Sequence, residues 1–201
     1  MMSMSISYVA GGRTRQKART EAAMVAAAQE LLVEGVTPTV EQAAERAGVS
    51  RATAYRYFVN QRLLLAAAHP ETEASSLLPP EPPQDPVERV ALVAHEIMRI
   101  IIDTEPERRA MLRFSLDPAR AGQDLPLRKG RRITWFEDAL SPLRPALGAG
   151  RHRKLVLAVA AAVGIESFVW LTDIAGLSRR DAAELLITTA RSLTETAITK
   201  M

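Results

Sequence analysis

Residues 39–58 read TVEQAAERAGVSRATAYRYF, and this stretch decides the fold. Thr39 and Gln42 have the spacing of a capping box, in which each side chain accepts a hydrogen bond from the other residue's backbone N–H. Gly48 is a typical helix stop, and Ser50 is a favoured first residue for a second short helix. Two short helices joined across a glycine turn are typical of a helix-turn-helix motif.

The second of these helices has an unusual surface for a chain that is only 4% aromatic. If Val49, Ala54 and Phe58 point inward, the remaining positions point outward: Arg51, Ala52, Thr53, Tyr55, Arg56 and Tyr57. Arginine can donate two hydrogen bonds to guanine, alanine permits close approach to a thymine methyl group, and hydroxyls can donate to phosphate oxygens. These residue types favour DNA contact. In the alternative interpretation, Tyr55 and Tyr57 pack half-buried against the preceding helix.

Positive charge is concentrated at the N-terminal end. The net charge is +3, and residues 1–62 contain eight basic and five acidic side chains, which accounts for the whole excess. A compact basic module indicates a polyanionic partner. Two interpretations of the basic run Arg13, Arg15, Lys17 and Arg19 remain open: a solvated, frayed tail, or an arm that reaches the DNA backbone or minor groove.

Apolar periodicity predicts helices along the whole chain. A first helix has the apolar face Ala18, Ala22, Val25, Ala28 and Leu32, and it stops at Gly35. Asn60 can cap a further helix from Gln61 to about His69.

Proline divides the chain. Half of its twelve prolines lie between positions 70 and 86, where no helix can continue. We therefore expect a disordered tail at 1–12, a helix-turn-helix domain with its connecting helix at 13–69, a proline-rich linker or loop at 70–86, and a larger helical domain at 87–201.

The C-terminal part contains the most apolar helices. Residues 151–175 are apolar nearly all round, so this helix needs partners on every side. We expect one partner to be its own domain and the other to be the same helix pair, about 151–175 and 178–199, of a second subunit. The stretch 155–171 is shorter than a membrane span and contains Glu166, which indicates a buried helix, no membrane association and a cytoplasmic protein.

Several kinds of site are not expected. The chain has no cysteine, and His69, His95 and His152 are far apart in sequence, so we predict no metal site. No glycine-rich phosphate loop and no acid–base pair at a recognisable spacing is present. We therefore expect no cofactor and no enzyme activity.

The stretch 39–58 resembles the helix-turn-helix of the TetR (tetracycline repressor) family of bacterial transcriptional regulators. Residues 166–186, ESFVWLTDIAGLSRRDAAELL, are similar to the closing helices of that family. The resemblance implies an all-α fold of about nine helices: an N-terminal three-helix DNA-binding domain and a larger domain for effector binding and dimerisation. It also implies a homodimer through the last two helices and a ligand cavity in the larger domain.

The resemblance also implies roles for individual residues. Thr39 and Thr53 would contact phosphates, and Tyr55 and Tyr57 would clamp the DNA backbone. Arg51, Ala52 and Arg56 would face bases or phosphates. The family commonly has a lysine at the position of Gln61. Gln61 is the last residue of the candidate DNA-binding set.

A second set of residues is a candidate effector site. Aromatic and methionine side chains suit an apolar ligand, and the candidates are Met98, Met111, Phe114, Trp135, Phe136 and Phe168. The alternative is that they form ordinary core packing. Glu166 has two interpretations as well: a hydrogen bond between helices or subunits, or recognition of a ligand.

These observations predict a sequence-specific DNA-binding transcriptional regulator. We expect a repressor whose partners are a near-palindromic double-stranded DNA operator and a small-molecule effector that releases it. Two alternatives remain: a regulator that has no effector and acts through a protein partner, and a structural protein that binds DNA without sequence preference.

Overall fold

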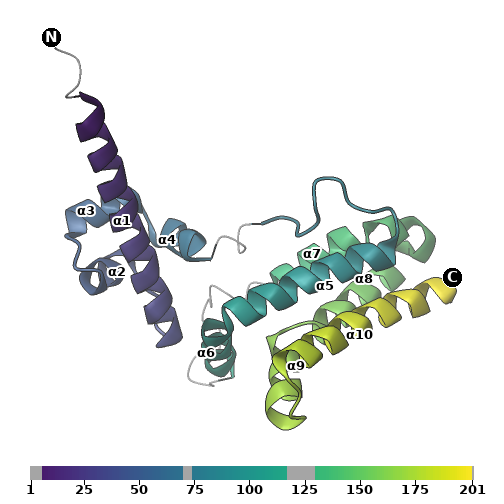
Figure 1. Cartoon of the computed structure of the whole chain (residues 1–201). Coiled ribbons are helices and arrows are strands. Elements are labelled where there is room, and N and C mark those ends of the chain that lie inside the picture. The colour runs from purple at the N-terminus through teal and green to yellow at the C-terminus, as the bar shows by residue number, and fades with distance from the viewer. Residues whose placement is uncertain (1–5, 70–73, 117–129, 201) are drawn as a thin grey trace. The chain divides into compact units, whose positions relative to one another are not determined.

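The computed structural model describes residues 6–69, 74–116 and 130–200, and every regular element in these ranges is a helix (Figure 1). The all-helical prediction is confirmed. The chain divides into two compact units, Met1–Glu73 and Ala74–Met201, and each has its own hydrophobic core.

The N-terminal unit consists of one long helix and three short ones. They are α1 (Ile6–Val33), α2 (Val40–Arg46), α3 (Arg51–Tyr57) and α4 (Gln61–Ala68). α2 and α4 pack against the C-terminal half of α1, and α3 packs against α2. The core is formed by Met24, Ala28, Val40, Ala43, Ala44, Ala54, Phe58, Leu64 and Ala68. Two polar contacts secure α1: Gln29 Nε2 donates to the Ala68 carbonyl at 3.0 Å, and Arg46 Nη1 lies 2.7 Å from Glu34 Oε1.

The start of α1 differs from the prediction. Residues 6–12, expected to belong to a disordered tail, lie inside α1, and residues 1–5 are outside the described ranges. Once the packed half of a helix is formed, each further residue adds a backbone hydrogen bond without a new nucleation step. The predicted apolar face is only partly buried, since Ala18 and Ala22 are exposed while Ala28 and Leu32 are buried.

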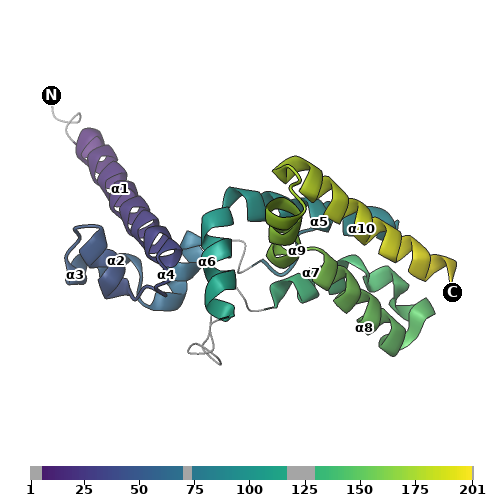
Figure 2. The ribbon, with the colours of Figure 1, turned by 90° about the horizontal axis from the view of Figure 1, so that it is seen from below.

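The C-terminal unit is a helical bundle. Its elements are α5 (Pro86–Asp103), α6 (Glu105–Ser115), α7 (Arg131–Ala139), a short 3-10 turn (Ser141–Leu143), α8 (Arg144–Ala162), α9 (Ile165–Val169) with a π-helical continuation (Trp170–Ile174), and α10 (Arg179–Thr199). Figures 1 and 2 show α5 and α10 lying side by side, and α10 also packs against α8. The core lies between α5, α7, α8 and α10.

The proline-rich segment is attached to this bundle. Trp135 Nε1 donates to the Ala74 carbonyl at 2.8 Å, and the Ser76 hydroxyl donates to Asp138. Leu77 and Leu78 pack against the core. Residues 74–85 therefore form a packed loop, residues 70–73 lie outside the described ranges, and the last proline of the segment, Pro86, already belongs to α5.

A break divides the apolar stretch that was predicted as one helix over 151–175. α8 ends at Ala162, and Val163 and Gly164 adopt extended backbone conformations. Arg132 fills the break: its Nη1 donates to the Val163 carbonyl at 3.0 Å and lies 3.0 Å from Glu166 Oε2. A Cβ atom at Gly164 would lie only 1.3 Å from Arg132 Nη1, so any side chain at this position would have to displace Arg132.

Length and composition alone would allow one helical stretch of the described chain, Ser141–Ile174, to cross a membrane. Half of its most apolar window is buried inside the unit. This burial agrees with the sequence-based prediction that residues 155–171 belong to a buried helix.

Candidate nucleic-acid interface

Local capping positions the helix-turn-helix. The Thr39 hydroxyl accepts from the Gln42 backbone N–H at 3.2 Å, and Gln42 Oε1 accepts from the Thr39 N–H at 2.9 Å, which confirms the capping box. Ser50 Oγ accepts from the Thr53 N–H at 3.3 Å. Gly48 makes the turn between α2 and α3 with a φ of +65°, a left-handed conformation that glycine adopts without strain.

The outward face of α3 contains most of the predicted set. Ala54 and Phe58 are buried in the core, and four side chains are exposed: Arg51, Ala52, Tyr55 and Arg56. Thr53 is half-buried. The two tyrosines differ: Tyr57 is half-buried and packs against the core, whereas Tyr55 is 38% exposed. The packing alternative therefore describes Tyr57, and Tyr55 lies on the surface.

Glu41 on α2 holds two of these exposed side chains. The Tyr55 hydroxyl donates to Glu41 Oε1 at 2.5 Å, and Arg51 Nη2 lies 2.9 Å from the same oxygen. The Arg51 guanidinium is also 5.8 Å from the centre of the Tyr55 ring, which is within the range of a cation–π contact. One carboxylate thus orders an arginine and a tyrosine at the surface of α3 before any ligand is bound.

This arrangement changes the acidity of both partners. The hydrogen bond from Tyr55 lowers the pKa of Glu41, and Arg51 lowers it further. The same hydrogen bond raises the pKa of Tyr55 above its ordinary value. At neutral pH the carboxylate is therefore charged and the hydroxyl keeps its proton. Sequence reasoning missed Glu41, because nothing in the local pattern relates it to a residue fourteen positions away.

The two remaining candidates lie near the loop before α2. Thr39 is exposed at the start of α2, where its hydroxyl caps the helix. The side-chain amide of Gln61, at the start of α4, donates to the Pro38 carbonyl at 3.0 Å. Gln61 therefore ties α4 to the residue that precedes Thr39, an anchoring contact that the sequence analysis did not foresee.

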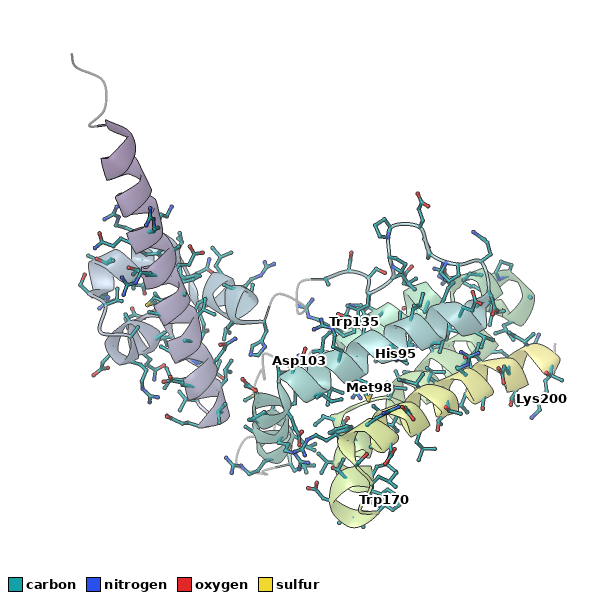
Figure 3. All side chains as sticks on the ribbon, in the orientation of Figure 1. His95, Met98, Asp103, Trp135, Trp170 and Lys200 are labelled. Carbon is teal, nitrogen blue, oxygen red and sulfur yellow. The ribbon has the colours of Figure 1, made fainter. Side chains whose placement is uncertain are left out.

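The candidate effector residues lie in the C-terminal core. Met98, Met111, Trp135, Phe136 and Phe168 are all buried, and the Phe114 side chain is outside the described part of the structure. Figure 3 labels Met98 on α5 and Trp135 on α7. These side chains pack the unit in the way that the core alternative expected, and a role in ligand binding stays a prediction.

The other polar candidates are accounted for by contacts within the unit. His95 is exposed (Figure 3), and Glu166 pairs with Arg132 of α7, an interaction between helices. His152 is buried, and its Nε2 lies 3.1 Å from the Leu140 carbonyl at the end of α7. Within the described ranges, no group of three or more His, Asp and Glu side chains is arranged to hold a metal ion.

Comparison with protein families identifies the N-terminal unit. Residues 24–68 match the family model described as bacterial regulatory proteins, tetR family. The match begins at Met24, the first buried residue among the α1 side chains that the structure describes (residues 15–33), and ends at Ala68, the last residue of α4. This unit contains a TetR-family DNA-binding domain. The matched domain makes the chain a DNA-binding transcriptional regulator, and α2 and α3 are its helix-turn-helix. No curated protein gives a significant sequence match to the chain.

Proposed function

We propose that this TetR-family regulator is a cytoplasmic repressor that binds a near-palindromic operator as a homodimer. The observation that carries the proposal is the surface of α3, where Arg51 and Tyr55 are held in place by Glu41 while Ala52 and Arg56 are exposed. A protein that binds only the phosphate backbone needs charge but not side chains ordered in this way.

Each residue of the α3 surface has a distinct role in this proposal. Arg51 and Arg56 donate to guanine or phosphate, and Ala52 allows the helix to approach the base edges. Tyr57 donates its hydroxyl to a backbone phosphate, together with Thr39 and Thr53 at the starts of the two helices. Tyr55 does the same in the complex, where its hydroxyl proton turns from Glu41 to a phosphate oxygen. Gln61 acts beside them by fixing the loop before α2 through Pro38.

The dimer is proposed to form through residues of about 151–175, which include most of α8 and all of α9, and through 178–199, which form α10. α8 and α10 pack against each other and each leave one face exposed. The exposed face of α8 includes Leu157, Ala158 and Ala161, and that of α10 includes Leu185, Thr188 and Ser192. Small and apolar side chains allow close packing with the same face of a second copy. A two-fold axis there would present two α3 helices to successive major grooves, about 34–36 Å apart.

The effector is proposed to act through the core of the C-terminal unit. A small apolar molecule among Met98, Met111, Phe114, Trp135, Phe136 and Phe168 would displace core side chains and favour a dimer with a different α3 spacing. Its influence is limited to its differential affinity for the two conformations. A regulator that acts through a protein partner instead of an effector shares the same operator surface.

Selection of bound duplexes from a random pool at near-physiological salt tests the proposal. We expect enrichment of a two-fold symmetric site by the native protein. Tyr55→Ala should weaken binding of that site by about tenfold or more, because it removes a phosphate donor and a partner of Arg51. Tyr55→Phe, which keeps the ring and removes only the hydroxyl, is the matched control for the aromatic contact.

Retained binding at low salt without enrichment of any site would contradict the proposal. That result would leave a structural protein with affinity for the DNA backbone alone.

A further inference from the structure

Two open grooves flank the basic segment of α1. One groove, of about 530 Å³, is lined by Arg15, Gln16, Arg19, Thr20 and Ala23 of α1 and by Ala47 and Val49 of the turn between α2 and α3. The other, of about 490 Å³, is lined by Gln16, Lys17 and Thr20 of α1 and by Thr53, Arg56 and Tyr57 of α3. Both grooves therefore lie between α1 and the helix-turn-helix.

The polar groups of the two grooves suit an anion. Neither lining contains a carboxylate. Thr20 uses its hydroxyl proton on the Gln16 carbonyl at 3.0 Å, which leaves the cationic side chains, the Gln16 amide and the hydroxyls of Thr53 and Tyr57 as donors. Such a set of donors matches the oxygens of a phosphodiester.

The cations of the grooves are not neutralised within the described structure. Other arginines of the chain pair with carboxylates, among them Arg46 with Glu34 and Arg51 with Glu41. The four groove cations, Arg15, Lys17, Arg19 and Arg56, have no such ion pair with any residue that the structure describes. Four unpaired positive charges on one surface attract a polyanion, because no internal contact has to be broken.

The cations of α1 lie on an ordered helix and not on a frayed tail. Lys17 and Arg19 are part of α1, whose C-terminal half is anchored in the core, so the chain arrives at the grooves with its backbone already ordered. Binding then requires ordering of side chains only, and the entropic cost is smaller than for a disordered arm.

We propose that the two grooves beside α1 bind phosphate groups of the DNA backbone, so that Arg15, Lys17 and Arg19 of α1 add a sequence-independent contact surface to that of α3. This inference rests on the proposed function, since it assigns α1 a part in the same DNA complex. The phosphate contacts of α1 add affinity on any duplex, while α3 discriminates between sequences.

The double variant Lys17→Gln/Arg19→Gln tests the inference, because it removes one cation from each groove. The full-length native and variant proteins are titrated with the selected operator and with an unrelated duplex at several salt concentrations. The control is Arg144→Gln/Lys200→Gln, which removes one arginine and one lysine of the C-terminal unit. Melting curves followed by circular dichroism check that all proteins are folded.

The expected result has two parts. The slope of log K against log salt concentration becomes less steep by about 0.9 for each phosphate that the variant no longer binds. Affinity for both duplexes falls by a similar factor of about tenfold, so the ratio between them is retained. The control should keep both the slope and the affinity of the native protein.

Other outcomes overturn the inference. An unchanged salt slope in the double variant would show that Lys17 and Arg19 bind no phosphate in the native complex. A decrease of affinity for the operator alone would assign the two side chains to base recognition. If the native protein shows no preference for the operator while the variant still weakens binding of the unrelated duplex, the proposed function fails and the phosphate-binding grooves stand.

Discussion

Glu41 connects the two helices of the DNA-binding motif at the level of single side chains. Its carboxylate accepts from Tyr55 and pairs with Arg51, and both partners belong to the surface that we propose for DNA. A negative charge on a DNA-binding surface repels phosphates, so its presence there needs a compensating role. We infer that Glu41 favours sequence discrimination over affinity, because it restricts where Arg51 and Tyr55 can lie.

The variant Glu41→Gln tests this role. We expect binding of unrelated duplex DNA to strengthen by about twofold to fivefold, because a repulsive charge is removed. The ratio of operator to unrelated affinity should fall, because Arg51 loses its ion pair and can adopt other positions. Fluorescence anisotropy with both duplexes measures the two effects. Glu45→Gln is the matched control, as Glu45 is an exposed carboxylate of the same helix; an equal fall of the ratio in both variants would contradict the positioning role.

Gly164 is a second residue at which neighbouring side chains restrict the amino acid that fits. Its backbone is extended, so any residue could adopt the conformation, and the restriction comes from Arg132. Gly164→Ala should displace the Arg132 side chain and remove its hydrogen bond to the Val163 carbonyl, which lowers the free energy of unfolding by about 1–2 kcal/mol.

Gly150→Ala is the comparison for this substitution. Gly150 lies in α8 two residues after Gly148, where a φ of +71° interrupts the helix, and a Cβ atom added at Gly150 has no neighbour within 4 Å. Alanine in this first turn after the interruption meets no clash and should not lower the free energy of unfolding. Both tryptophans of the chain lie in the C-terminal unit (Figure 3), so urea titrations followed by tryptophan fluorescence report on this unit. Destabilisation of equal size in both variants would show that Arg132 is not the cause.

At the scale of elements, a cluster of ion pairs joins α6 to the π-helical continuation of α9 and to the start of α10. Glu105 is only 7% exposed, and it accepts from Arg109 Nε and Arg179 Nε, each at 2.6 Å. Arg109 also donates to Asp173 Oδ2 at 2.7 Å. Burial by itself would raise the pKa of Glu105, but hydrogen bonds from the two arginines outweigh it and hold that pKa below its usual value. The hydrogen bond from Arg109 lowers the pKa of Asp173 to about 2.

This cluster predicts how the C-terminal unit responds to acid. The pKa of Asp173 is lower in the folded state than the ordinary value of 3.8, so between these values the unfolded state binds more protons. The stabilising contribution of Asp173 is therefore complete above about pH 4 and disappears as the pH falls towards 2. Asp173→Asn should make the melting temperature less dependent on pH in this window, as measured by tryptophan fluorescence.

A second substitution identifies the partner that is responsible. In a background that contains Arg109→Gln, the change Asp173→Asn should have little further effect on the pH dependence, because the main hydrogen-bond donor is already absent. An undiminished effect in that background would contradict the assignment to Arg109.

At the scale of the whole molecule, three leucines with nearly equal exposure allow a matched test of the proposed dimer. Leu157 on α8 is 42% exposed, Leu185 on α10 is 44% exposed, and Leu92 on α5 is 43% exposed. Only the first two lie on the faces that we propose for dimerisation. Leu157→Glu/Leu185→Glu should therefore produce a monomer in sedimentation experiments, since it buries four charges in a two-fold interface.

The same variants connect dimerisation to DNA binding. A monomer engages one half-site, and we expect its affinity for the operator to be lower by about a hundredfold or more, because the second half-site is no longer bound intramolecularly. Leu92→Glu should leave both the molecular mass and the affinity unchanged. A dimer that persists in the double variant would contradict the proposed interface.

Features that depend on neighbours in sequence were predictable. The caps Thr39, Ser50 and Asn60 each satisfy a backbone N–H three residues further on, so their spacing alone identifies the helix starts. The glycine stops and the outward face of α3 follow from the same short-range rules. These features were sufficient to recognise the helix-turn-helix, and the family match of residues 24–68 agrees with them.

Features that depend on distant residues were not predictable. The contact between Glu41 and Tyr55 spans fourteen positions, and those from Arg132 to Glu166 and from Trp135 to Ala74 span 34 and 61. The sequence contains no periodic pattern at such separations. For this reason the helix break at Gly164 and the packed loop of residues 74–85 became apparent only in the folded unit.

The sequence by itself determined the helical class, the helix starts and stops of the DNA-binding unit, and the residue types exposed on α3, because hydrogen bonds and side-chain periodicity within one or two turns set these properties. Only the tertiary structure decided which of the described α1 side chains are buried, which carboxylate contacts Arg51 and Tyr55, and where cations line grooves beside α1. These properties arise from contacts between helices, since packing chooses among the faces that a helix presents.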